Sequence, residues 1–175
     1  NFGGTLSAIA KDVDNDGAID IVATASSANK ISWFKNDGNQ IFTEYIIDNL
    51  NQASWAYIVD LDNDNDEDII AVTLGSELVW YENDGNQIFS KNIISTNISR
   101  GRSVISVDLN FDGLKDIITA AKTSNEITWW EQLPNNSFIK HNIDANLGGA
   151  DFAMPYDYDL DNDLDIIATG NSSNE

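Results

Sequence analysis

One nine-residue acidic motif, D-x-[DN]-x-D-[GN]-x-x-D, occurs four times in this chain. The copies cover residues 12–20, 60–68, 108–116 and 157–165, which we call loops one to four. Each copy has side-chain oxygens at positions 1, 3, 5 and 9, and position 6 is Gly or Asn, which best tolerate a left-handed backbone. Calcium takes about six to eight oxygen ligands, so alternate carboxylates with a position-7 carbonyl would suit it. A solvated acidic turn would account for one copy, but poorly for four with identical spacing.

The residues that follow each motif distinguish these loops from helix-flanked calcium loops. An EF-hand has a bidentate Glu at its twelfth position, whereas position 12 here is Ala23, Ala71, Thr119 or Ala168. Short β-branched runs, such as residues 69–72, follow position 9 and are typical of buried strands. Each acidic loop is therefore predicted to join two strands.

The acidic charge of the chain is concentrated in these loops. Loops one, two and four each hold four carboxylates at positions 1, 3, 5 and 9, and loop three holds three, so these positions account for 15 of the 29 acidic residues. The net charge of −20 argues against nucleic acid as a partner and against adsorption on anionic membranes. No apolar run is long enough for membrane insertion.

Three markers recur with the motif and indicate internal repeats. The last Asp of each loop falls at 20, 68, 116 and 165, and an Ile-x-Trp type segment recurs at 31–34, 78–81 and 127–130. An Asn-Asp-Gly turn, a strong hairpin signal, occurs at 36–38 and 83–85. Each repeat thus reads as four strands, with the Trp residues packed between repeats. We place the repeats, within a single domain, at approximately 5–48, 53–95, 101–144 and 150–175, the last incomplete.

Four antiparallel strands every 40 to 50 residues are typical of the blades of a β-propeller. The predicted fold is therefore all-β, with three full blades and the inner half of a fourth. The first repeat starts on an inner strand, so it would not supply the outer strands that the fourth lacks. We expect further blades to come from a longer parent chain or from other copies of this chain.

The acidic loop followed by Asp-Ile-Ile, then Ile-x-Trp-Phe/Tyr and Asn-Asp-Gly, resembles the FG-GAP/VCBS repeat family across nearly the whole chain. The family's Phe-Gly and Gly-Ala-Pro signature is degraded here to Phe2-Gly3 and residues 148–150. The family includes the N-terminal propeller of integrin α subunits and secreted lectin propellers. The resemblance implies a calcium-stiffened propeller, usually seven-bladed, used for binding or as a scaffold, but it does not imply a particular ligand.

Position by position, the resemblance implies up to four Ca²⁺ ions, one in each loop. Loop three should bind most weakly, because Asn110 is a neutral ligand. The implied side-chain ligands are Asp12, Asp14, Asp16, Asp20, Asp60, Asp62, Asp64, Asp68, Asp108, Asn110, Asp112, Asp116, Asp157, Asp159, Asp161 and Asp165. The implied position-7 carbonyls are those of Ala18, Asp66, Leu114 and Asp163.

Four residues depart from the repeat pattern and are candidates for binding a ligand on the face opposite the acidic loops. Trp55 and Phe152 stand where two of the repeats have Ser, and Arg100 and Arg102 lie on a similar crossover. An aromatic ring with arginines could hold a sugar or an acidic group. The competing interpretation is that these residues are simply exposed on the surface and bind no ligand.

The residues give little support for catalysis. The chain has no Cys and a single His, His141, so disulfides, thiolate or multi-histidine metal sites and the usual nucleophile–base sets are missing. The expected function is non-catalytic extracellular recognition or adhesion, with a glycan or extracellular protein as ligand. The alternative is an accessory or scaffold module of a larger secreted polysaccharide-active enzyme. Because millimolar extracellular calcium fills even weak sites, we expect the protein to be secreted or on the cell surface.

Overall fold

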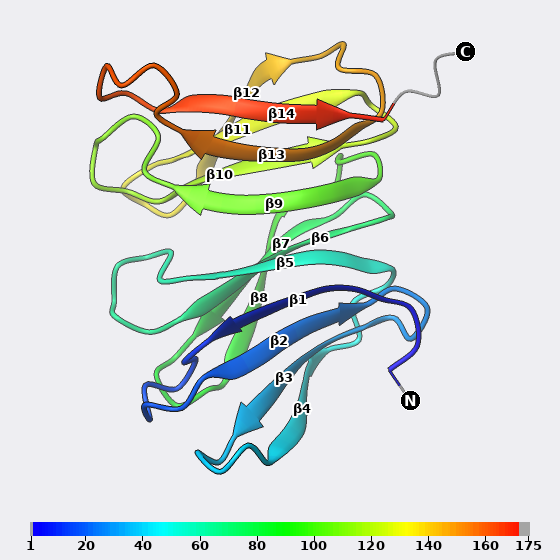
Figure 1. Cartoon of the computed structure of the whole chain (residues 1–175), viewed down its shortest axis with the longest axis vertical. Helices are drawn as coiled ribbons and strands as arrows, with labels where there is room; N and C mark the ends of the chain where they lie inside the picture. Colours follow the sequence, from blue (N-terminus) through cyan, green and yellow to red (C-terminus); the bar gives the residue numbers. More distant parts are fainter. Residues whose placement is uncertain (1, 172–175) are drawn as a thin grey trace.

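Short antiparallel strands joined by tight loops make up the described part of the chain. The computed structural model describes residues 2–171, which form fourteen strands (Figure 1). Within this part of the chain, no helix has the length and hydropathy needed to cross a membrane. Residues 172–175, assigned above to the incomplete fourth repeat, lie outside the described residues.

Residues 2–171 form three four-stranded antiparallel sheets and one two-stranded sheet, each in simple up-and-down order. The first sheet contains β1 (Thr5–Lys11), β2 (Asp20–Ala25), β3 (Lys30–Asn36) and β4 (Phe42–Asp48). The second contains β5 (Ala53–Val59), β6 (Asp68–Thr73), β7 (Leu78–Asn83) and β8 (Phe89–Ser95). The third contains β9 (Gly101–Val107), β10 (Asp116–Ala121), β11 (Glu126–Gln132) and β12 (Phe138–Asp144). The last contains β13 (Ala150–Tyr156) and β14 (Asp165–Gly170). The prediction of antiparallel four-stranded propeller blades is confirmed.

The sheets stack in chain order, and their first strands lie next to one another (Figure 1). Hydrogen bonds between neighbouring first strands fix this arrangement. The Ala56 amide donates to Ser7 Oγ at 3.2 Å, and the Ala153 amide donates to Ser103 Oγ at 3.3 Å. Serine at this position therefore links one sheet to the next, in addition to its place in its own strand.

Three hydrophobic clusters form the core, one between each pair of consecutive sheets. Trp33 and Trp80 occupy the same position in β3 and β7, and each packs against the following sheet with 5% of its surface exposed. Trp129 has this position in β11 but is only partly buried, and its ring stacks on His141 at 4.6 Å between centroids. The prediction that all three Trp side chains pack between sheets is confirmed for two. Trp129 differs because the sheet that follows has only β13 and β14 within residues 2–171.

The two-stranded sheet is less buried than its counterparts. All six residues of β6 and of β10 are buried, whereas Ile167 in the equivalent strand β14 is 40% exposed. The difference has a simple cause, since no third strand pairs with β14 in the described residues. An apolar sheet surface and a row of backbone hydrogen-bonding groups are therefore left uncovered.

Candidate metal sites

The four acidic loops connect the first and second strands of the four sheets. They join β1 to β2, β5 to β6, β9 to β10 and β13 to β14. All four lie on the same side of the stacked sheets, at the left in Figure 1. The repeat of the sheet thus places one acidic loop per blade on a common face.

The first Asp of each loop holds the turn by accepting backbone N–H groups. In loop one, Asp12 Oδ1 accepts the Asp16 amide at 3.1 Å and Asp12 Oδ2 accepts the Gly17 amide at 2.8 Å. Asp16 Oδ1 in turn accepts the Ala18 amide at 2.9 Å. Both bonds recur at Asp60 and Asp108, whereas Asp157 accepts only the second, from the Asn162 amide to its Oδ2 at 3.2 Å. The position-7 amide also donates to the position-5 carboxylate in each of these loops. The pairs are Asp66 to Asp64, Leu114 to Asp112, and Asp163 to Asp161. The loops therefore share one fold.

Two positions of each loop are left-handed, and the sequence indicates only one of them clearly. Position 6 has positive φ in all four loops, from 75° at Asn162 to 91° at Gly113, as its Gly/Asn pattern predicts. Position 4 is also left-handed, with φ between 56° and 64°. Asn15 and Asn63 hint at this in loops one and two, but the equivalent Phe111 and Leu160 give no such signal. For these bulky residues the conformation is strained.

The last Asp of each loop joins the loop to its sheet. Asp20, Asp68 and Asp116 are fully buried. In loop two, Asp68 Oδ2 accepts the Leu61 amide at 3.2 Å and Oδ1 accepts the Asn83 amide of β7 at 2.8 Å. Loops one and three repeat both bonds, and in loop four Asp165 accepts the Tyr158 amide at 3.1 Å. The motif spacing marks position 9 as a ligand, but it does not reveal this structural role.

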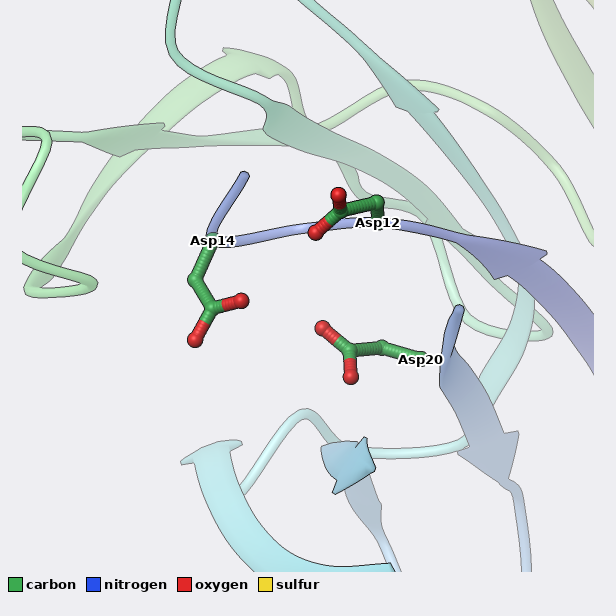
Figure 2. Close-up of side chains that lie close together, drawn as sticks. All are labelled: Asp12, Asp14 and Asp20. Atoms are coloured by element: carbon green, nitrogen blue, oxygen red, sulfur yellow. The ribbon is translucent and has the colours of Figure 1, made fainter. Parts of the chain in front are cut away.

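Three of the loops gather carboxylates closely enough to share one cation. In each group the candidate ligand atoms lie within 4.8 Å of one another. In loop one, Figure 2 shows the carboxylates of Asp12, Asp14 and Asp20 directed at a common space. The group in loop two is Asp60, Asp62 and Asp64, and the group in loop four is Asp157, Asp159 and Asp161.

Each of these three loops also contains a buried carboxylate oxygen with no hydrogen-bond partner. These atoms are Asp14 Oδ1, Asp62 Oδ1 and Asp157 Oδ1. A buried anionic oxygen without a partner is costly, whereas coordination to a cation satisfies it. The donor set is made of hard oxygen ligands, which suits calcium or magnesium better than a soft metal. The residues present therefore fit a bound divalent cation.

Loop three differs because the Asn110 side chain makes two hydrogen bonds with Asp112 inside the loop. Its Nδ2 donates to Asp112 Oδ2 at 3.0 Å, and its Oδ1 accepts the Asp112 amide at 3.1 Å. In the described residues, loop three has neither a group of three converging carboxylates nor a buried oxygen without a partner. These findings agree with the expectation that it is the weakest of the four sites.

Burial and mutual repulsion disfavour the charged form of several loop carboxyls. Burial raises the pKa of Asp68 to about 7 and also raises the pKa of Asp116. Burial, with the nearby charge of Asp64, raises the pKa of Asp62, and the charge of Asp161 raises the pKa of Asp163. A bound cation would oppose these shifts by favouring the charged form.

Loop one contains the one exception to this trend among the resolved shifts of the loop carboxyls. The Ala18 N–H bond and then Lys35 hold the pKa of Asp16 below its usual range. The Lys35 ammonium makes ion pairs with both Asp14 and Asp16, the second at 3.0 Å. No sequence pattern indicated that a lysine would reach this loop from β3.

The four candidate ligand-binding residues do not form one group. The rings of Trp55 and Phe152 meet edge to face at 6.1 Å between centroids and line an apolar cavity of about 420 Å³ formed by the first strands. Arg102 Nε donates to Asp151 Oδ1 at 2.7 Å, next to Phe152 in the chain. Arg100 lines a separate hollow with Asn51 and other polar residues. These residues lie at or near the starts of β5, β9 and β13, at the strand ends opposite the acidic loops.

The stacked antiparallel sheets, each with an acidic loop after its first strand, define a repeat protein built from propeller-type blades with candidate metal loops. An FG-GAP-like repeat model matches residues 12–71 and 60–119, so the two matches together cover residues 12–119. The chain therefore belongs to the FG-GAP-like repeat family. Repeats of this family often bind calcium and are usually non-catalytic modules. A comparison with curated proteins gave no match.

Proposed function

We propose that this protein is a calcium-binding β-propeller module that serves extracellular recognition or adhesion. The observation that best supports calcium binding is the buried carboxylate oxygen without a hydrogen-bond partner in three loops. These oxygens belong to Asp14, Asp62 and Asp157. A fold that repeats this unfavourable arrangement at equivalent loops is best explained if a cation satisfies it.

In this proposal the carboxylates at positions 1, 3 and 5 hold the ion, together with the carbonyl at position 7. The position-9 carboxylates already accept backbone amides, and their remaining lone pairs would complete the oxygen shell. Calcium supplies the positive charge that compensates for the crowded carboxylates when it is bound. Loop three would bind most weakly, because Asn110 lowers its negative charge.

Calcium dependence favours an extracellular setting, either secreted or at the cell surface. Extracellular calcium is millimolar and fills even weak sites of this kind. The uncovered edge of β14 fits a third and a fourth strand, and the uncovered face of its sheet fits further blades, from a longer parent chain or from other copies of this chain. A complete ring of about seven such blades would cover the faces of all its sheets and leave only short, protected strand edges.

The proposed recognition site is the aromatic cavity between the first strands, in which Trp55 and Phe152 lie toward the face opposite the acidic loops. Trp55 and Phe152 supply an apolar surface, and Arg102 with Asp151 supplies polar groups beside it. Aromatic rings with nearby hydrogen-bonding groups suit a sugar ring or an extended peptide. The alternative is that the protein serves only as an accessory or scaffold module of a larger secreted polysaccharide-active enzyme.

Screening on a glycan array in millimolar calcium tests this proposal. We expect binding to at least one glycan, with at least a tenfold loss of affinity in the double variant Trp55→Ala, Arg102→Ala, because removal of stacked aromatic area and a polar partner costs about 1.4 kcal/mol or more. Tyr45→Ala is the control, since Tyr45 is 50% exposed on β4 and does not line the cavity. Unchanged glycan binding by the double variant would rule out this cavity. Absence of binding to any glycan or extracellular protein would favour the scaffold role.

A further inference from the structure

One lysine pairs with two carboxylates at proposed ligand positions of an acidic loop. Lys35 lies on β3, and its Nζ makes ion pairs with Asp14 Oδ2 and, at 3.0 Å, with Asp16 Oδ2. Asp14 and Asp16 hold positions 3 and 5 of loop one, where the metal ligands are proposed. The ammonium therefore shares two of the carboxylates that a divalent cation would need.

The equivalent residues of the next two sheets carry the opposite charge. Lys35 stands two residues after Trp33, and the same position after Trp80 and Trp129 is Glu82 and Glu131. Glu82 accepts Asn92 Nδ2 at 3.0 Å, and Glu131 lies 2.7 Å from His141 Nε2, so both are engaged with the fourth strand of their own sheet. Of these three equivalent residues, only Lys35 places a positive charge at the acidic loop of its own sheet.

Lys35 pairs with only one of the two oxygens of the Asp14 carboxylate in loop one. The Asp14 side chain is 5% exposed, and while its Oδ2 is paired with Lys35, its Oδ1 is buried without a partner. A single ammonium therefore compensates for only part of the negative charge of loop one, and a divalent cation would compensate for the rest. Because both cations need Asp14 and Asp16, they compete for the same carboxylates.

We propose that Lys35 is a built-in counter-cation that keeps loop one ordered without metal and lowers its affinity for calcium. This inference rests on the calcium function proposed above. Loop one then fills at a higher calcium concentration than its four carboxylates alone would indicate. Loop two has the same four carboxylates and Glu82 at the position equivalent to Lys35. Its one lysine contact in the described residues, Lys11, is with Glu67, which is not a proposed ligand, so loop two fills before loop one.

The test is a calcium titration of the Lys35→Met variant followed by amide NMR. The Gly17 amide, which donates to Asp12 Oδ2, reports on loop one, and the Gly113 amide, which donates to Asp108 Oδ2, reports on loop three. We expect the calcium midpoint at Gly17 to fall about tenfold in Lys35→Met, because calcium no longer has to displace the ammonium from Asp14 and Asp16; a tenfold change corresponds to about 1.4 kcal/mol. The midpoint at Gly113 should not move.

Lys91→Met is the matched control. Lys91 has the same 33% side-chain exposure as Lys35 and also pairs with two carboxylates, Asp48 and Glu77, away from the acidic loops. Neither glycine should shift its midpoint in this variant. With chelator present, Lys35→Met should also melt at a lower temperature than Lys91→Met, because loop one has then lost its counter-cation.

The outcomes separate the two proposals. An unchanged or raised Gly17 midpoint in Lys35→Met, with calcium still bound elsewhere, would overturn the role of Lys35 and leave the calcium function standing. If neither glycine responded to calcium and no heat of calcium binding were detected in any of the proteins, the calcium function would fail and this inference with it.

Discussion

Removal of calcium by a chelator should lower the melting temperature of this protein by about 15–30 °C. Each site filled at about 100 times its dissociation constant stabilises the fold by about 2.7 kcal/mol. Loops one, two and four have converging carboxylates, so three such sites contribute about 8 kcal/mol by the same relation. For a chain of this length each kcal/mol shifts the melting temperature by about 2–4 °C.

The acidic loops also explain why the metal-free protein should have a low stability. Burial of the loop carboxylates disfavours their charged forms, as the raised pKa values of Asp62, Asp68 and Asp116 indicate. Without metal, Asp14, Asp62 and Asp157 each keep a buried oxygen without a hydrogen bond. Melting curves recorded by circular dichroism with calcium and with chelator measure the effect. A potassium salt at the same ionic strength is the control, and a midpoint that does not change on removal of calcium would contradict the calcium proposal.

The second large effect is expected from Asp68→Ala, which should destabilise the fold by about 3 kcal/mol or more with or without calcium. Asp68 is fully buried and accepts the amides of Leu61 and Asn83 at 3.2 and 2.8 Å. Its removal leaves two N–H groups without their partner, and each such loss costs about 1–3 kcal/mol when the group is buried. The loop would keep only the Asn83 Nδ2 bond to the Glu67 carbonyl, at 3.2 Å, of its two hydrogen bonds to Asn83 of β7.

Asp62→Ala is the informative comparison for this prediction, because Asp62 lies in the same loop but has a buried oxygen without a partner. In chelator, Asp62→Ala should cost little or even stabilise the fold, since it removes a buried charge. In calcium it should lose the stabilisation from one site. Urea unfolding of both variants under both conditions measures these differences. Equal destabilisation of the two variants in chelator would show that Asp68 has no special structural role.

The sequence was sufficient to predict the blade architecture, because each blade is encoded by local signals. The acidic motif joins the first two strands of every sheet, the Trp marker lies in the third strand of the three four-stranded sheets, and the Asn-Asp-Gly turn follows that strand in the first two. The left-handed backbone at position 6 was also predictable, because Gly17 and Gly113 tolerate it at no steric cost.

Features that depend on contacts between distant residues were not predictable in this way. The exposure of Trp129 depends on which strands cover it, although its sequence context matches that of Trp33 and Trp80. The pairing of Lys35 with Asp14 spans 21 residues and exists because β3 passes beside loop one. The structural role of Asp68 depends on amides from two other segments of its sheet. The left-handed Phe111 and Leu160 follow the fold of the loop rather than their own preferences.

Calorimetric titration of calcium into the protein and into the triple variant Asp14→Ala, Asp62→Ala, Asp157→Ala tests most directly whether the acidic loops are metal sites. These three residues carry the buried oxygens without partners in loops one, two and four. We expect about three stronger sites and one weaker site in the unaltered protein, and only the weak site of loop three in the triple variant. Equal numbers of calcium ions bound with equal affinity by both proteins would contradict this assignment.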